Sequence, residues 1–154
     1  MTQKSKIVIR AAMPSDLPQL AQIAGENSKN PWNQAQLEQE LGLEFSYMLL
    51  AEYESVTAGF INMHILMKTA HINEIAIENT YRRRGIGTNL VNICVEYAKR
   101  EKCENITLEC RKSNTGALEF YEKLGFEILG IRRRFYCLPE DDAVIMRISI
   151  KGEI

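Results

Sequence analysis

The amino-acid sequence predicts an α/β fold, with helices covering a mixed (α+β) sheet in a single domain over residues 1–154. Two periodicities carry this prediction. Segments in which apolar and polar residues alternate, as in strands, are interleaved with segments in which apolar residues recur every three or four positions, as in helices. Because 45% of the 154 residues are hydrophobic, one domain of this size can bury a core without disulfides or metals.

The N-terminal part is expected to form one strand and two helices. The strand covers Lys6–Ala12, and Pro14-Ser15-Asp16 then supplies a turn and the cap of a first helix. A break at Asn30-Pro31 precedes a second, shorter helix, which Gly42 ends. The residues expected to face the core from these helices are Leu17, Leu20, Ile23, Ala24, Leu37 and Leu41.

Three apolar, β-prone runs follow. Tyr47–Tyr53 and Ala58–Met67 are separated by the four residues Glu54-Ser55-Val56-Thr57, a spacing typical of a hairpin. The third run covers His71–Ile77. These segments are therefore expected to be consecutive strands of the sheet.

The second half alternates between helices and strands. A helix begins after Gly85, a strand covers Asn105–Cys110, and Ser113-Asn114 caps a further helix that Gly125 ends. Helical spacing joins the apolar residues Ile86, Leu90, Cys94 and Ala98 in the first of these helices and Ala117, Leu118, Tyr121 and Leu124 in the second. The last two strands are expected over Ile128–Tyr136 and Ala143–Ile150. The predicted order is β-α-α-β-β-β-α-β-α-β-β.

Composition argues against several classes of protein. The formal net charge of -1 gives no general attraction to nucleic acid or to an anionic membrane. The four cysteines form no C-x-x-C pair and lie far from the two histidines, which argues against a zinc site or a disulfide framework. The polar N-terminus and the lack of a run of about 20 apolar residues predict a cytoplasmic protein without membrane contact.

The segment Arg82-Arg83-Arg84-Gly85-Ile86-Gly87 lies where a strand is expected to give way to a helix. The first turn of a helix leaves backbone N–H groups unpaired, so this turn is suited to bind a phosphate. A nucleotide-hydrolysing P-loop would need Lys-Ser/Thr after the glycine, and a dinucleotide fold would need a small residue at Leu90. The pattern that remains is R-x-x-G-x-G.

This turn and the preceding Asn73-Glu74-Ile75-Ala76-Ile77 resemble the acetyl-CoA motif of the Gcn5-related N-acetyltransferases, the GNAT superfamily. A second block, Leu108–Asn114 with Phe120-Tyr121-Glu122 and Leu124-Gly125-Phe126, is similar to the signature of the RimI-type ribosomal-protein-alanine acetyltransferases. The further segments similar to that subfamily are Pro31-Trp32, Arg132–Tyr136 and Asp142–Met146. The sequence departs from the pattern at Cys110, Phe135 and Glu74, where members commonly carry Val, Tyr and a small polar residue.

The resemblance implies a GNAT fold, with about seven mostly antiparallel strands and about four helices, and an enzyme that uses acetyl-CoA and no metal. It implies that Glu109 is the general base for an attacking amine and that Tyr121 is the acid that protonates the leaving thiolate. The strand at Ile75–Ile77 would bind the pantetheine arm and polarise the acetyl carbonyl. The residues that the resemblance assigns to the coenzyme are Ile75, Ala76, Ile77, Arg83, Arg84, Gly85, Ile86, Gly87, Thr88 and Asn114.

Several of these residues have simpler interpretations. Glu109 and Arg111 can form an exposed ion pair, Tyr121 can be a core residue, and Asn114 can be a helix cap. Glu74 is a rival base, because other branches of the superfamily place a working carboxylate near this position. The residues expected to be without a catalytic role are His64 and His71, taken as plain strand residues, Cys110, and Arg132–Arg134, which alternation would split between two faces.

The acceptor is expected to be a basic protein N-terminus, as on a ribosomal protein. Between residues 26 and 54 six glutamates face one lysine, and Glu140-Asp141-Asp142 adds more negative charge, which favours a basic acceptor. Trp32 and Tyr136 are the side chains expected to grip the acceptor. The alternatives are an acetyltransferase of a small amine, such as a polyamine, amino acid or antibiotic, and a non-catalytic coenzyme A module. The expected state is a monomer or weak homodimer that binds no nucleic acid directly.

Overall fold

The computed structural model describes residues 6–150 and has the predicted order of elements. Its seven strands are hydrogen-bonded in the order β1-β2-β3-β4-β5-β7-β6. The β4–β5 pair is parallel, whereas β1–β2, β5–β7 and β7–β6 are antiparallel, so the predicted mixed α/β fold is confirmed. The strands are β1 (Ile7–Ala11), β2 (Ser46–Tyr53), β3 (Val56–Leu66), β4 (Thr69–Ile77), β5 (Asn105–Arg111), β6 (Glu127–Cys137) and β7 (Glu140–Ser149). The helices are α1 (Leu17–Asn27), α2 (Gln34–Leu41), α3 (Ile86–Arg100) and α4 (Thr115–Lys123).

The chain divides into two compact units. The first comprises the residues up to Met63 together with Glu74–Cys94, and the second comprises His64–Asn73 together with the residues from Val95 on. Strands β3 and β4 and helix α3 each contribute residues to both units. The expectation of a single domain over residues 1–154 stays a prediction.

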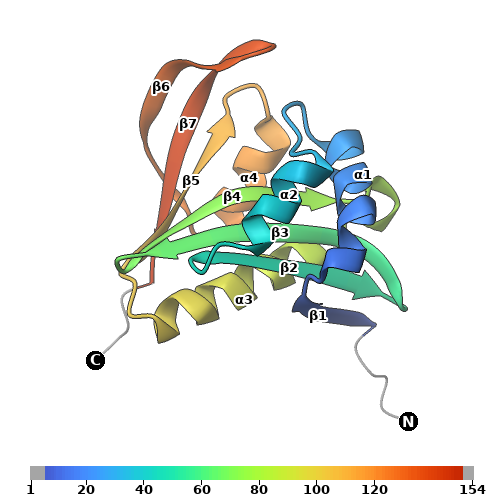
Figure 1. The fold of residues 1–154 in the computed structure, drawn as a ribbon. Helices are drawn as coiled ribbons and strands as arrows, with labels where there is room; N and C mark the ends of the chain where they lie inside the picture. Colours follow the sequence, from blue (N-terminus) through green and yellow to red (C-terminus); the bar gives the residue numbers. More distant parts are fainter. Residues whose placement is uncertain (1–5, 151–154) are drawn as a thin grey trace. The chain divides into compact units, whose positions relative to one another are not determined.

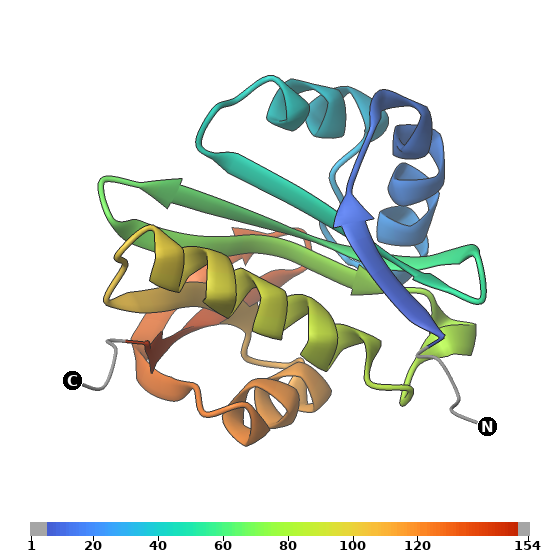
Figure 2. The ribbon, with the colours of Figure 1, turned by 90° about the horizontal axis from the view of Figure 1, so that it is seen from below.

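The core of the first unit lies under α1 and α2. Figure 1 shows these two helices side by side next to β2, and Figure 2 shows β1 leading into α1. Leu17, Leu20, Ile23 and Ala24 of α1 are buried, as their spacing predicts, together with Leu37 of α2. They pack with Met48, Leu50, Phe60 and Ala76 from the strands.

The ends of these elements differ locally from the expectations. Asp16 makes no side-chain cap on α1; its carboxylate accepts hydrogen bonds from Arg10 and from the Met13 amide instead. The β2–β3 hairpin is tighter than expected, because only Glu54 and Ser55 form its turn. Both have positive φ values, of 50° and 71°, which a two-residue hairpin turn requires when its twist matches that of the strands.

The second unit contains β5, β6, β7 and α4, and β6 and β7 form a long hairpin (Figure 1). Asn114 caps α4 by accepting a hydrogen bond from the Ala117 amide, and Gly125, at φ 103°, follows the helix. Both features agree with the sequence-based prediction. Tyr121 and Phe126 are buried and pack edge to face, with ring centroids 5.4 Å apart.

Strand β6 departs from simple alternation. Its pairing with β7 shifts twice, between Ile128 and Gly130 and between Arg132 and Tyr136. Within the second irregularity Arg134 has a φ of 52°, and its amide donates to the Asp142 carboxylate. Strict alternation, on which the predicted division of the three arginines between two faces was based, is therefore wrong at Arg134, because a bulge breaks the two-residue period there.

Candidate active site

The glycine–arginine turn precedes α3 in the first unit, as predicted. Gly85 has a φ of 79° and Arg83 a φ of 65°, and the helix begins at Ile86. A left-handed backbone conformation costs a non-glycine residue about 1 kcal/mol or more of free energy. Arg83 adopts this conformation, so the surrounding structure holds the turn in an uncommon backbone geometry. The turn leads directly into the first backbone amides of α3, and the side chains of all three arginines are exposed.

The three arginines have different surroundings. Arg82 donates to the Asn27 side chain at 2.7 Å and fixes the turn to the end of α1. Arg84 donates to the Tyr53 hydroxyl at 3.1 Å, and its guanidinium carbon lies 4.8 Å from the centre of that ring. Arg83 makes no hydrogen bond or ion pair with another side chain in residues 6–150, so its charge is the one most available to a phosphate.

The end of β4, which precedes the turn, packs closely against β3. A Cβ on Gly59 would come within 2.7 Å of the Ala76 carbonyl oxygen, so this position of β3 requires glycine. The parallel pairing of β4 with β5 ends at Ile72 and Leu108, and Ile75–Ile77 lie beyond it. Ala76 is buried, whereas Ile75 and Ile77 are half-buried.

Glu109 lies in the second unit and is held by a histidine. His71 Nε2 lies 2.7 Å from Glu109 Oε2, and His71 Nδ1 lies 2.6 Å from the Thr107 hydroxyl. The Glu109 side chain keeps 23% of its surface exposed. The hydrogen bond from His71 lowers the pKa of Glu109 below its ordinary value and outweighs the opposing effect of burial.

Arg111 and Tyr136 lie next to this carboxylate in the same unit. Arg111 is 8% exposed, donates to the Pro139 carbonyl at 2.8 Å, and lies 4.2 Å from the centre of the Tyr136 ring. Burial raises the pKa of Tyr136 to about 12, with a contribution from the Glu109 charge. The alternative of an exposed Glu109–Arg111 ion pair does not describe the structure, because Arg111 is buried and lies 3.9 Å from the Asp141 carboxylate, whereas Glu109 is hydrogen-bonded to His71.

The proposed acid and the Asn114 side chain are both on α4. Tyr121 is only 5% exposed and contacts Phe120 and Phe126, so its ring is part of the core, as the simpler interpretation expects. Asn114 uses its side-chain oxygen as the helix cap, which leaves the nitrogen of the same amide as the group that would bind the coenzyme.

Glu74, the rival base, belongs to the first unit. Its half-buried carboxylate accepts hydrogen bonds from the Trp32 amide and from the Ser28 hydroxyl. Burial nevertheless raises the pKa of Glu74 to about 7, since no cation is among the groups that stabilise its charge. Trp32 itself is half-buried against the core of this unit.

Comparison with known proteins identifies the family. Residues 17–126 match the model of the acetyltransferase (GNAT) family. The chain belongs to this family. It is 32% identical over 149 residues to a Bacillus subtilis protein named "Putative [ribosomal protein bS18]-alanine N-acetyltransferase", covering 96% of this chain and 98% of that protein. It is 28% identical to the Escherichia coli [ribosomal protein bS18]-alanine N-acetyltransferase, covering 88% and 93% of the two chains.

Solved structures agree with this assignment. The crystal structure of the Escherichia coli ribosomal-protein-S18-alanine N-acetyltransferase superposes with a TM-score of 0.86 at 25% identity, covering 96% of each chain. Arabidopsis thaliana NAA60, solved with acetyl-CoA, has the same fold, with a TM-score of 0.86 at 20% identity and coverage of 95% and 99%. The chain is therefore a GNAT acetyltransferase, and acetyl-CoA is the donor in this family.

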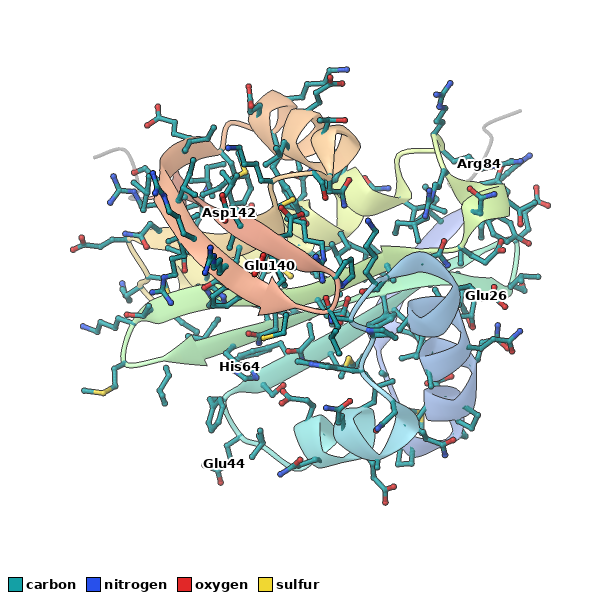
Figure 3. The ribbon with its side chains drawn as sticks, turned by 90° about the horizontal axis from the view of Figure 1, so that it is seen from above. Glu26, Glu44, His64, Arg84, Glu140 and Asp142 are labelled. Carbon is teal, nitrogen blue, oxygen red and sulfur yellow. The ribbon has the colours of Figure 1, made fainter. Side chains whose placement is uncertain are left out.

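The acidic residues of this GNAT chain are less available than their number indicates. In the first unit Glu52 and Glu54 pair with Arg10 and Lys6. In the second unit Glu140 Oε1 lies 3.8 Å from Arg134 Nε, and the Asp142 carboxylate accepts a hydrogen bond from the Arg134 amide. Figure 3 shows Glu140 and Asp142, both on β7. Of the exposed glutamates between residues 26 and 54, Glu26, Glu38 and Glu44 have no cationic partner within residues 6–150.

Cys94, Cys103 and Cys110 are buried and Cys137 is exposed. Burial raises the pKa of Cys110 to about 11, which makes it a poor nucleophile. Among residues 6–150 no group of His, Cys, Asp or Glu side chains has the arrangement of a metal site, and no helix there is long and apolar enough to cross a membrane.

His71 is the residue of this GNAT site that sequence reasoning missed. It was expected to be a plain strand residue, and it does lie in β4, but it also binds the proposed base. The register pairs His71 with Thr107, and Glu109 lies two residues further along on the same face of β5. Spacing within one strand cannot reveal this contact, because it joins residues 38 positions apart through the pairing of β4 with β5.

Proposed function

We propose that this enzyme transfers an acetyl group from acetyl-CoA to the α-amino group of an N-terminal alanine on a protein, as the names of its relatives state for those proteins. The observation that carries the mechanism is the Glu109 carboxylate, which is partly exposed, held by His71 and ionised at neutral pH. In this proposal Glu109 is the general base and Tyr121 the general acid.

The chemistry suits an N-terminal amine. An amine attacks a thioester only in its neutral form, and an α-amine, with a reference pKa of about 7.7–8.0, loses its proton more readily than a lysine side chain at about 10.4. A carboxylate therefore suffices as base, acting directly or through one water. Because the pKa of Glu109 is lowered, this carboxylate stays ionised throughout the neutral range.

Tyr121 would supply the proton that the departing thiolate needs. A phenol has a reference pKa near 10 and is protonated at neutral pH, so it is a suitable acid. Its ring is fixed between Phe120 and Phe126, which limits the orientations of its hydroxyl. Transfer is direct in this proposal, with no acetyl group on the enzyme.

The residues proposed to hold acetyl-CoA have the character that its pyrophosphate and pantetheine arm need. Exposed Arg83 and the first amides of α3, from Ile86 to Thr88, would bind the phosphates, with Arg84 close to them. The backbone of Ile75–Ile77 would bind the pantetheine arm, and the Asn114 amide would hold the coenzyme from α4. Gly85 and Gly87 would allow the backbone to approach the phosphates.

A basic ribosomal protein N-terminus is the acceptor that we propose. Glu26, Glu38 and Glu44 of the first unit would attract it weakly, since exposed charges are screened by salt. We propose that Trp32 and Tyr136 contact its first residues. An acceptor made on ribosomes places the reaction in the cytoplasm, and we propose that the enzyme acts there as a monomer or weak homodimer without binding nucleic acid.

The test is product analysis with purified enzyme and labelled acetyl-CoA. The substrates are a basic peptide that begins with alanine, the same peptide with its N-terminus blocked, and the polyamine spermidine. We expect the label on the α-amine of the free peptide, located by mass spectrometry, and none on the blocked peptide. Acetylation of spermidine with none on the free peptide would contradict the proposal and favour a small-amine acceptor.

A further inference from the structure

Three polar side chains form a continuous hydrogen-bonded row in the second unit. Thr107 and Glu109 point to the same face of β5 because they are two residues apart, and the parallel register brings His71 of β4 opposite Thr107. The imidazole spans the two, with Nδ1 2.6 Å from the Thr107 hydroxyl and Nε2 2.7 Å from Glu109 Oε2. Both distances are short for hydrogen bonds of a ring nitrogen.

The row fixes which ring nitrogen carries a proton. An ionised carboxylate only accepts hydrogen bonds, so Nε2 is the donor toward Glu109. The Thr107 hydroxyl can donate to an unprotonated Nδ1, or it can accept from a protonated one while it donates to the Ala70 carbonyl 3.4 Å away. In either arrangement the Nε2–H remains directed at Glu109.

We propose that His71 is a positioning residue for Glu109, which holds the carboxylate in one orientation while Thr107 holds the imidazole. This inference rests on the function proposed above, because it matters for catalysis only if Glu109 is the base. With Oε2 occupied by His71, Glu109 would reach the amine or its water through Oε1. A base held in one orientation reacts more often than one that rotates freely.

The groups that face Glu109 from its own and the neighbouring strands show why the hydrogen bond from His71 affects the pKa of this carboxyl. From β4 it is faced by His71, and from β6 by Arg132, which also lowers its pKa, and by Tyr136. On β5 its neighbours are Cys110 and Arg111, and β7 places the uncharged Ile145 opposite it. The hydrogen bond from His71 is the largest single influence, so removing it is expected to raise the pKa of Glu109.

The experiment compares three variants with the wild type on the alanine peptide. His71→Phe removes the donor, His71→Gln keeps an N–H donor, and His64→Phe is a matched control that removes the other histidine. We expect His71→Phe to lower kcat about 10-fold with the KM values for both substrates nearly unchanged. His71→Gln should recover most of this loss, and His64→Phe should leave kcat within about twofold.

A double variant tests whether His71 acts through Glu109. In the Glu109→Gln background His71→Phe should cause no further loss of kcat, since the residue that it positions is already disabled. Additive losses would overturn the inference. An equal loss in His71→Gln and His71→Phe would also overturn it, because a hydrogen-bond donor would then not be what matters.

A measurement without turnover separates this inference from the proposed function. The carboxyl carbon of Glu109, followed by NMR during a pH titration, should titrate at higher pH in His71→Phe than in the wild type. No shift would overturn the inference whatever the activity is. A shift in an enzyme whose kcat is unaffected by Glu109→Gln would instead overturn the assignment of Glu109 as base and, with it, a catalytic role for His71.

Discussion

Glu74 of the first unit and Glu109 of the second are the same side chain in two different environments. Glu74 is half-buried, and the groups that donate to it, the Trp32 amide and the Ser28 hydroxyl, are neutral, so burial raises its pKa to about 7. Glu109 is also partly buried, but it accepts a hydrogen bond from His71 and has Arg132 nearby, and its pKa is lowered. Burial by itself therefore does not determine the proton affinity of these carboxylates; the donors that they face do.

Glu74 and Glu109 differ in two properties that a general base needs, the proton affinity of the carboxylate and its accessibility. By proton affinity alone Glu74 is the better base, because general bases work best with a pKa near the operating pH. By access Glu109 is better, since its side chain is 23% exposed, whereas the Glu74 carboxylate is occupied by the Trp32 amide and the Ser28 hydroxyl. We infer that Glu74 fixes the segment between α1 and α2, and that Glu109 takes part in the chemistry.

A loss of kcat as large as that expected from replacing the base is expected for Tyr121, which lies in the same unit as Glu109. Tyr121→Phe should lower kcat roughly 100-fold, because the thiolate would leave without its acid, while the KM for acetyl-CoA stays nearly constant. The measurement is steady-state kinetics together with a thermal melt, since the Phe ring can keep the packing against Phe120 and Phe126. A kcat within twofold of the wild type would limit Tyr121 to a core role.

The next effect concerns the stability contributed by Glu74. Its pKa of about 7 in the folded state lies above the ordinary 4.5, so the folded state binds more protons and stability falls as the pH rises from about 4.5 to 7. Glu74→Gln removes this loss and should raise the free energy of unfolding above pH 7 by roughly 2–3 kcal/mol, with little change near pH 4. Urea unfolding near pH 4 and above pH 7 measures this difference in the free energy of unfolding between variant and wild type. Equal differences at the two pH values would show that burial does not raise the pKa of Glu74.

The smallest expected effect is on the binding of acetyl-CoA, in which neither of the two glutamates is proposed to take part. Arg83→Ala should weaken acetyl-CoA binding about fivefold, a loss of about 1 kcal/mol, because one available cation is removed from the phosphates. Arg84→Ala is the matched comparison and should lower the melting temperature as well, since Arg84 also holds Tyr53. Calorimetric titration with coenzyme A gives both affinities, and an unchanged affinity in Arg83→Ala would remove this arginine from the proposed site.

The parts of the fold that depend on local spacing could be predicted from the sequence. The stripe of Ile86, Leu90, Cys94 and Ala98 is buried in α3, and Asn114 caps α4, because both features depend only on neighbours within a turn or two. The turn at Gly85 could be predicted for the same reason. The segments around Gly85 and Asn114 also carry the resemblance to the GNAT superfamily.

The surroundings of the two carboxylates could not be predicted. The contact between His71 and Glu109 depends on the register of a parallel strand pair, which a single sequence does not encode in its local spacing. The raised pKa of Glu74 depends on where Ser28 and Trp32 place their hydrogen-bonding groups. The bulge near Arg134 is likewise set by pairing with β7, so the assumption of regular alternation failed there.

A direct comparison of Glu109→Gln with Glu74→Gln decides whether the accessible, ionised carboxylate is the base. Both variants keep the size of the side chain and should bind coenzyme A like the wild type. In single-turnover acetylation of the alanine peptide, we expect Glu109→Gln to lower the rate roughly 100-fold or more and Glu74→Gln to lower it less than about fivefold. The reverse order would show that Glu109 is not the base and would make Glu74 the base.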